Sequence, residues 1–408
     1  MPFFKKIPKS KVVAVIDITS SSVGGALVES NEGCPLTILA APKKSVNFLF
    51  NVGFEASLRS TMDSLRFVAK ELKNLYPGKI EQVLCVFSSP WFISQTKIIT
   101  VTREKSFEVK KIFFSRLLEE EEKNFLPWLK QAGQEERKTS SQFIEHEVIK
   151  AELNGYHTRK PAGKTARSVK SYIYLSAGAK KAIESTEKEI EEIFGRAQLR
   201  FATSPLVAFR VLDAIISNKE GFLIIDIGGE TTEINLIRDN VLEQSVSFPR
   251  GANLLFRKIS SILNTFLKEA PSILKTYVRG HRTMESSDKI TSAIKDSVKE
   301  WHDSLGDSIA VMAKENLLPQ NVFLTGDEPA CGYFFSCVEK SDFSEYTILG
   351  KHFIAQKINP RWLARYFNPD NSMTQSFESF KKCEVGNFQH KDIMLMMEAL
   401  YANKFINF

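Results

Sequence analysis

Two stretches of the sequence combine the residue types that bind phosphate and its accompanying metal ion. The clearer one runs from Phe222 to Glu233, where a short apolar run ends in Asp226 and a turn of glycines and threonines follows. A weaker counterpart, Val12 to Ser22, delivers Asp17 into a turn of threonine and serines. Such turns leave backbone N–H groups free to hold phosphate oxygens, and the aspartate can hold the metal. Two copies predict a phosphate clamp made by two similar halves of the molecule.

The groups expected to form this clamp come from both turns. They are Asp17, Thr19, Ser20, Ser21, Ser22, Asp226, Gly228, Gly229, Thr231 and Thr232. Asp17 and Asp226 are the predicted metal ligands. Apolar alternation resumes after each turn, which indicates that each turn joins two antiparallel strands. A Rossmann turn differs, because it leads directly into a helix.

The elements that must position the turns follow from hydrophobic periodicity. Strands are expected at Val12–Ile16, Gly24–Val28 and Leu36–Ala40, which together form a meander. Ala56 to Leu75 has apolar residues at helical spacing. Asp392 to Lys404 is apolar around most of its circumference, which is typical of a buried helix rather than of a membrane anchor.

Length and composition favour a folded protein with two lobes. The chain has 408 residues, which suits two lobes of about 150 to 200 residues each. Its content of 43% hydrophobic and 25% charged residues is that of a globular protein. The net charge of +7, without a dominant basic tail, argues against nucleic acid as a partner. The five cysteines include no CxxC pair and the six histidines have no ligand spacing, so no structural zinc is expected.

Three surface and targeting predictions follow from charge and hydropathy. No apolar run approaches the roughly 20 residues that cross a bilayer, and the start lacks the apolar core of a signal peptide, so we expect a cytoplasmic protein. Residues 1–11 alternate apolar residues with lysines, which could give weak adhesion to an anionic membrane surface or could be a frayed tail. A basic stretch predicts either a solvated face or a charge-assisted protein contact; its residues are Arg159, Lys160, Lys164, Arg167 and Lys170.

With its elements in this order, the chain resembles the superfamily of actin, heat-shock chaperones and sugar kinases, and within it the bacterial cell-division protein FtsA. The Asp17 turn resembles the phosphate 1 motif of that superfamily, and the Asp226 turn its phosphate 2 motif. Phe323 to Gly326 resembles the adenosine motif. Glu145 to Gly155 is similar to a strand of the extra subdomain of FtsA, and Ser247 to Asn253 to its strand-turn-helix after phosphate 2.

The resemblance implies an α/β, two-lobed actin-like (ribonuclease H-like) ATPase fold with an inserted FtsA-type α+β subdomain. It also implies ATP and Mg²⁺ between the lobes, and it adds Gly251, Asn253, Lys275 and Gly326 to the binding residues. The implied division of the chain is 1–80 for the first lobe, 81–178 for the inserted subdomain, 179–220 for the return to the first lobe and connecting helix, 221–325 for the second lobe, and 326–408 for the adenosine motif and C-terminal return.

The same resemblance implies partners. FtsA-like proteins self-associate into filaments along the inner membrane, contact the tubulin-like division protein FtsZ and recruit later division proteins. The nearest alternative is PilM, a cytoplasmic actin-like protein that binds the tail of a pilus inner-membrane protein. The few residues after Lys404 are too short for the linker and amphipathic helix that usually end FtsA, which favours PilM. A small-molecule kinase on the same fold is a third alternative.

Several positions depart from the family's pattern. Phosphate 2 normally has a third glycine and a final aspartate, and this chain has Glu230 and Glu233. A glutamate beside a triphosphate is repulsive unless it points to solvent or meets Mg²⁺. Thr19 replaces a glycine of phosphate 1, and Ser204-Pro205 replaces the Glu or Gln that can orient water for attack on the γ-phosphate. We therefore expect a clamp retained for assembly, with weak or absent ATP hydrolysis.

Overall fold

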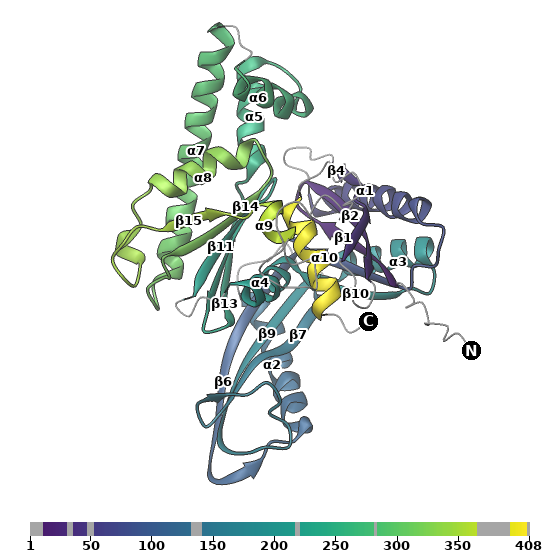
Figure 1. The fold of residues 1–408 in the computed structure, drawn as a ribbon, viewed down its shortest axis with the longest axis vertical. Coiled ribbons are helices and arrows are strands. Elements are labelled where there is room, and N and C mark those ends of the chain that lie inside the picture. The colour runs from purple at the N-terminus through teal and green to yellow at the C-terminus, as the bar shows by residue number, and fades with distance from the viewer. Residues whose placement is uncertain are drawn as a thin grey trace, which may run out of the picture.

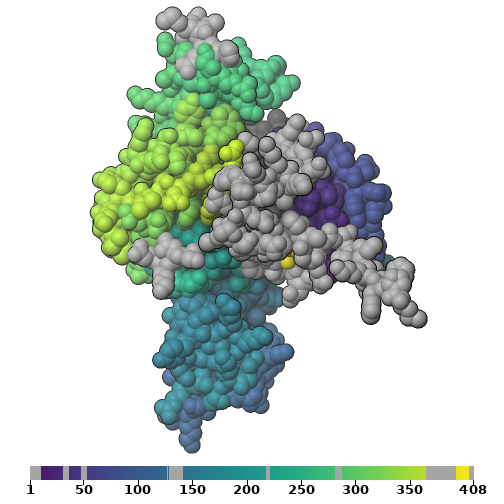
Figure 2. Space-filling model, viewed as in Figure 1, coloured from purple at the N-terminus to yellow at the C-terminus, as the bar shows by residue number. Residues whose placement is uncertain are grey.

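A computed structural model describes residues 11–30, 36–46, 53–131, 141–216, 221–280, 284–364 and 392–405. Two lobes lie side by side, and each is built around its own sheet (Figure 1). A third sheet projects from one end of the molecule and helices of the second lobe project from the opposite end (Figure 1), and the same two projections are seen in the space-filling view (Figure 2). The α/β, two-lobed architecture with an inserted sheet is the one expected.

The first lobe contains a sheet with strand order β10-β5-β1-β2-β3, to which β4 adds by pairing with β2. Its strands are β1 (Lys11–Ile18), β2 (Ser22–Ser30), β3 (Thr37–Ala40), β4 (Lys43–Ser45), β5 (Gln82–Phe87) and β10 (Gln198–Thr203). The antiparallel pairs β1 with β2 and β2 with β3 confirm the predicted meander. β5 runs parallel to β1, so this strand, which falls within the expected inserted range 81–178, lies in the first-lobe sheet.

Helices cover both faces of this sheet. They are α1 (Phe54–Leu75) and α3 (Lys180–Phe194) on one face, and α4 (Ser204–Ile215) and α10 (Ile393–Phe405) on the other. The two-residue period of β1 sends Ala14 and Ile16 into a core cluster with Leu65 of α1, and Val15 into a cluster with Met397 of α10. α10 packs against α4, β1 and β2, which confirms the predicted buried C-terminal helix.

The second lobe contains a five-stranded sheet with order β13-β12-β11-β14-β15. Its strands are β11 (Phe222–Ile227), β12 (Thr232–Arg238), β13 (Val241–Phe248), β14 (Asn321–Gly326) and β15 (Ile354–Lys357). β11 and β12 are antiparallel, which confirms that the glycine-rich turn joins two strands and does not lead into a helix. Its helices are α5 (Ala252–Leu263), α6 (Ala270–Val278), α7 (Met284–Met312) and α8 (Ala330–Lys340).

The third sheet has order β6-β9-β7-β8 and is antiparallel throughout its described pairs. Its elements are β6 (Phe92–Glu108), α2 (Lys111–Gln131), β7 (Ser141–Leu153), β8 (Tyr156–His157) and β9 (Thr165–Ala179). Leu117 and Phe125 of α2 form a small core cluster with Ile173 and Leu175 of β9. β9 leads directly into α3, so the inserted sheet is tied to the first lobe.

None of the helices in the described segments has both the length and the hydropathy that a membrane span requires. The basic N-terminal segment, residues 1–10, lies outside the described residues. Cys85 and Cys331 are buried free thiols and Cys337 is a half-buried one, whereas Cys34 and Cys383 lie outside the described residues.

Candidate functional site

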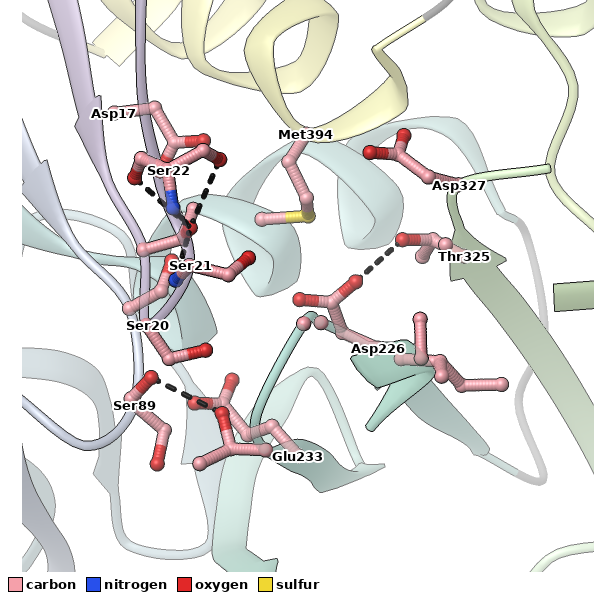
Figure 3. Close-up of a pocket in the computed structure, with 18 of the residues that line it drawn as sticks. Asp17, Ser20, Ser21, Ser22, Ser89, Asp226, Glu233, Thr325, Asp327 and Met394 are labelled. Carbon is pink, nitrogen blue, oxygen red and sulfur yellow. Dashed lines mark hydrogen bonds between the residues drawn. The ribbon is translucent and has the colours of Figure 1, made fainter. Parts of the chain in front are cut away.

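The two predicted phosphate turns meet at the boundary between the lobes. The first follows β1 and the second follows β11, and both line one cleft with a volume of about 130 Å³ (Figure 3). Ligand pockets for small molecules usually enclose roughly 300 to 1,000 Å³. The cleft in this structure is therefore smaller than a nucleotide site.

The first turn uses its own backbone donors. The hydroxyl Oγ1 of Thr19 accepts hydrogen bonds from the backbone N–H of Ser21 at 3.2 Å and of Ser22 at 3.0 Å. The N–H of Thr19 in turn donates to the carbonyl of Ser22 at 3.0 Å. The threonine that replaces the family's glycine thus takes up N–H groups that were expected to hold phosphate.

The second turn is in direct contact with the first. The N–H of Glu230 donates to the Oγ of Ser20 at 3.1 Å, which is a hydrogen bond between the two lobes. A Cβ added at Gly229 would overlap the Oγ and Cβ of Ser21, so only glycine permits this approach. A phosphate group therefore does not fit between the turns unless they move apart.

Glu230 takes neither of the positions expected from the sequence. Its carboxylate accepts a hydrogen bond from Asn253 Nδ2 at 2.7 Å and pairs with the guanidinium of Arg257 at 2.8 Å through both oxygens. A charge-assisted bidentate pair of this kind fixes the side chain in orientation as well as in place. Glu230 is thus held against α5, where its side chain is 15% exposed, and it does not line the cleft.

Both predicted metal ligands face the cleft as perturbed carboxyls. Burial raises the pKa of Asp226 to about 6, although Oδ1 accepts a 2.6 Å hydrogen bond from Thr325. Burial, followed by the charge of Asp392, raises the pKa of Asp17 well above its usual value. Oδ1 of Asp17 has no hydrogen-bond donor within the described segments. The two carboxyls therefore hold their protons more tightly than free aspartates do.

Glu398 of α10 is a further buried carboxyl beside Asp17. Its side chain is fully buried, and burial followed by the charge of Asp17 raises its pKa strongly. Two buried carboxyls without other donors can lie together when one keeps its proton and donates it to the other. This pair extends the acidic character of the cleft into the core of the first lobe.

A lysine connects the two lobes across the cleft. Nζ of Lys43, on β4, lies 2.7 Å from Oδ2 of Asp392 and 3.0 Å from Oδ2 of Asp327. Asp392 precedes α10 of the first lobe and caps it by accepting the N–H of Leu395 at 3.2 Å, whereas Asp327 follows β14 of the second lobe. Burial alone would raise the pKa of Asp392, but the charge of Lys43 and the backbone N–H groups lower it.

Glu233 closes the lower part of the cleft. It accepts hydrogen bonds from Asn235 Nδ2 at 3.0 Å and from the hydroxyl of Ser204 at 3.4 Å. Burial raises its pKa to about 8, and the carboxyl is held in place by these two hydrogen bonds. Nearby, Thr231 Oγ1 donates to the carbonyl of Ser89 at 3.1 Å, a further contact between the lobes.

Most of the predicted binding residues line the cleft. They are Asp17, Thr19, Ser20, Ser21, Ser22, Asp226, Gly228, Gly229, Thr231, Asn253 and Gly326. Thr232 lies behind it, where its hydroxyl accepts the indole N–H of Trp301 at 2.9 Å. Gly251 packs against the backbone of Gly228, and Lys275 is exposed on α6 away from the lining residues.

Several residues of the site were missed from the sequence. Lys43, Ser89, Thr325, Asp327, Asp392 and Met394 line the cleft, and Glu398 is buried beside Asp17. Met394 extends from α10 toward the space between the serine turn and Asp226 (Figure 3). An available signal was the single carboxylate, Glu398, inside an otherwise apolar helix.

The residues do not fit Mg²⁺-ATP in the arrangement described. The phosphate turns touch, the cleft volume is small, and an ammonium group already lies among the carboxylates. Within the described ranges, no group of three or more His, Cys, Asp or Glu side chains is placed to hold a metal ion.

The chain was compared with known proteins. No protein-family model matches it. The cell division protein FtsA of Neisseria meningitidis is 21% identical over 283 residues, which is 69% of this chain and 63% of that protein. The match thus spans less than two thirds of the relative's length.

Solved structures share the architecture. The structure of a PilM–PilN type IV pilus biogenesis complex matches with a TM-score of 0.61 and 16% identity, over 95% of this chain and 97% of that one. The ethanolamine utilization protein EutJ of Carboxydothermus hydrogenoformans gives a TM-score of 0.42 and 15% identity, over 88% and 85% of the two chains. The match to the PilM–PilN structure shows that the chain has the actin-like fold expected from its sequence.

Proposed function

We propose that this chain is an actin-like scaffold protein of bacterial cell division, which self-associates and links a tubulin-like FtsZ ring to other division proteins without turning over ATP. The similarity to FtsA and the inserted sheet support the scaffold role. The observation that carries the proposal is the direct contact between the two phosphate turns, through Glu230 N–H and Ser20 Oγ. A clamp closed on itself suits a structural joint better than a catalytic site.

Binding of ATP and Mg²⁺ stays a prediction. It requires the turns to part, the Thr19 hydroxyl to release the N–H groups of Ser21 and Ser22, and the lobes to separate. Even then the hydroxyl of Ser204, which stands where the family has Glu or Gln, is a poor group for orienting water. We therefore propose that nucleotide, where it binds, acts as a structural ligand.

A pilus adaptor of the PilM kind is the second candidate. The match to the PilM–PilN complex covers 97% of that chain. Under this alternative the partner would be the cytoplasmic tail of a pilus inner-membrane protein. Both candidates place the chain in the cytoplasm, at the inner face of the membrane. A small-molecule kinase on the same fold stays the third alternative.

The proposal is tested with purified full-length chain in two assays run in parallel. Sedimentation and electron microscopy should detect assemblies whose amount does not depend on ATP hydrolysis, and phosphate release should stay at the buffer rate. Turnover near the 1 s⁻¹ or more of ordinary enzymes would overturn the non-catalytic scaffold. Pull-down with an FtsZ-type protein against a pilus membrane-protein tail separates the two candidates, because each predicts capture of one of them alone.

A further inference from the structure

Lys43 lies at the centre of the acidic cleft. Its Nζ contacts the carboxylates of Asp327 and Asp392, and its charge also acts on Asp17 and Asp226. These four aspartates come from the ends of β1, β11 and β14 and from the start of α10. Carboxylates from two lobes would hold a divalent cation with phosphate in an open cleft of this kind, but in the described residues they are not grouped as metal ligands. Here a side-chain ammonium supplies the positive charge.

The electrostatics of the lysine agree with this position. Burial by itself lowers the pKa of a lysine, but Asp392 and Asp327 outweigh burial and raise the pKa of Lys43 well above its usual value. The ammonium therefore stays charged at any physiological pH. Asp392 is oriented for this contact because its other oxygen caps α10 by accepting the N–H of Leu395. The pair is thus fixed to the first lobe, and Asp327 is drawn to it from the second.

Neighbouring groups narrow the rest of the cleft. The serine turn and the glycine turn are hydrogen-bonded to each other, and Met394 reaches into the cleft from α10 (Figure 3). Ser89 Oγ also donates to Ser247 Oγ at 3.0 Å, which joins the two lobes on the side of the inserted sheet. Closure in this structure is therefore accounted for by side chains of the protein itself.

We propose that Lys43 is a resident cation that replaces Mg²⁺ in the cleft and holds the two lobes closed without nucleotide. This inference rests on the proposed role of the cleft as a structural joint. Lys43 of β4 thus bridges the two lobes, as a complex of metal and nucleotide would otherwise do. It also explains how a chain with the fold of the FtsA and PilM type keeps a closed cleft while its phosphate turns are in contact.

The experiment measures thermal unfolding of the full chain in EDTA and in millimolar Mg²⁺, each without nucleotide. Lys43→Gln removes the cation. Lys44→Gln is the matched control, since this neighbouring lysine is exposed and its Nζ lies over the ring of Phe67 at 4.8 Å. Asp327→Asn is a second variant, whose side chain is 68% exposed, so that it cuts the contact with the second lobe without endangering folding.

Wild type and Lys44→Gln should melt at the same temperature with and without Mg²⁺. Lys43→Gln should melt roughly 5 °C lower in EDTA, because its carboxylates are left without a counter-ion, and Mg²⁺ should restore most of that loss. Asp327→Asn keeps the Lys43 ammonium. The backbone amide hydrogens of β4 should exchange faster in this variant than in the wild type, and Mg²⁺ should not slow them.

Two results would overturn the inference. The first is a rise in the melting temperature of the wild type on adding Mg²⁺ that is as large as the rise for Lys43→Gln. The other is a Lys43→Gln variant that melts like Lys44→Gln in EDTA, together with unchanged exchange in Asp327→Asn. Either result leaves the scaffold proposal standing, because that proposal is tested separately by assembly and phosphate release.

Discussion

Replacing Gly229 by alanine is the sharpest perturbation of the contact between the two turns. A Cβ at this position would overlap Oγ and Cβ of Ser21, and it would approach Asn253 Nδ2 to 3.4 Å, which is ordinary contact. Inserting a methyl group into a filled contact costs about 1 to 3 kcal/mol. We expect Gly229→Ala to lower the free energy of unfolding by an amount in this range.

The cost should come from Ser21, so a second substitution should remove it. Ser21→Gly deletes both overlapping atoms, and the double variant should recover most of the loss, with a coupling energy of about 1 to 2 kcal/mol. Gly306→Ala, the same chemical change in the middle of α7, is the matched control. Its change in the free energy of unfolding should simply add to that of Ser21→Gly, because a Cβ at position 306 meets Phe343 alone, at 4.0 Å.

The assay is urea unfolding of the four members of each cycle, in EDTA and without nucleotide. Coupling between Gly229 and Ser21 means that the two turns touch in solution. A coupling energy below about 0.5 kcal/mol, the scatter of independent sites, would refute the reasoning, because it would mean that the turns stand apart. The comparison needs no knowledge of activity.

Three further predictions concern the rest of the molecule. Burial raises the pKa of Glu145 to about 8, from the 4.5 or so of an exposed glutamate. Because ionisation of Glu145 is opposed in the folded state, the free energy of unfolding should fall as pH rises from about 4.5 to 8, by at most about 5 kcal/mol for this group. Glu145→Gln should flatten that part of the pH profile. An unchanged slope in urea titrations of the variant would count against the assignment. Gly306→Ala should raise the free energy of unfolding by about 0.5 to 1 kcal/mol, since alanine favours a helix interior; a loss in the same assay would show that Phe343 cannot accept the methyl group. Reversing Lys164 and Arg167, both exposed at the far end of the inserted sheet, to glutamate should weaken self-assembly or partner pull-down, and equal binding at low salt would exclude this surface.

The fold was predictable where one stretch of sequence contains the whole signal. The apolar run to Asp226, the two glycines and the renewed alternation define a strand, a turn and a strand, and β11 and β12 follow that pattern. The all-round apolar segment at the C-terminus likewise predicted the buried α10. In both cases the local period of side chains decides the element before any tertiary contact forms.

The state of the site was not predictable, because its deciding contacts join distant residues. In the sequence, Lys43 lies hundreds of residues before Asp327 and Asp392. The three side chains meet because β4, β14 and α10 pack together. Lys43 follows Pro42 in what reads as an ordinary turn, so no local pattern marks it. The charge of Glu230 was noticed, but its partner Arg257 lies one helix further on, and without that partner the carboxylate was expected to meet phosphate or solvent.

The central claim is that the cleft is closed by the protein's own side chains. The most direct test is a crystal structure of the full chain grown in EDTA without nucleotide. Our account predicts the Glu230 N–H bonded to Ser20 Oγ, and Lys43 between Asp327 and Asp392. Phosphate turns standing apart, with the Lys43 ammonium turned to solvent, would contradict it.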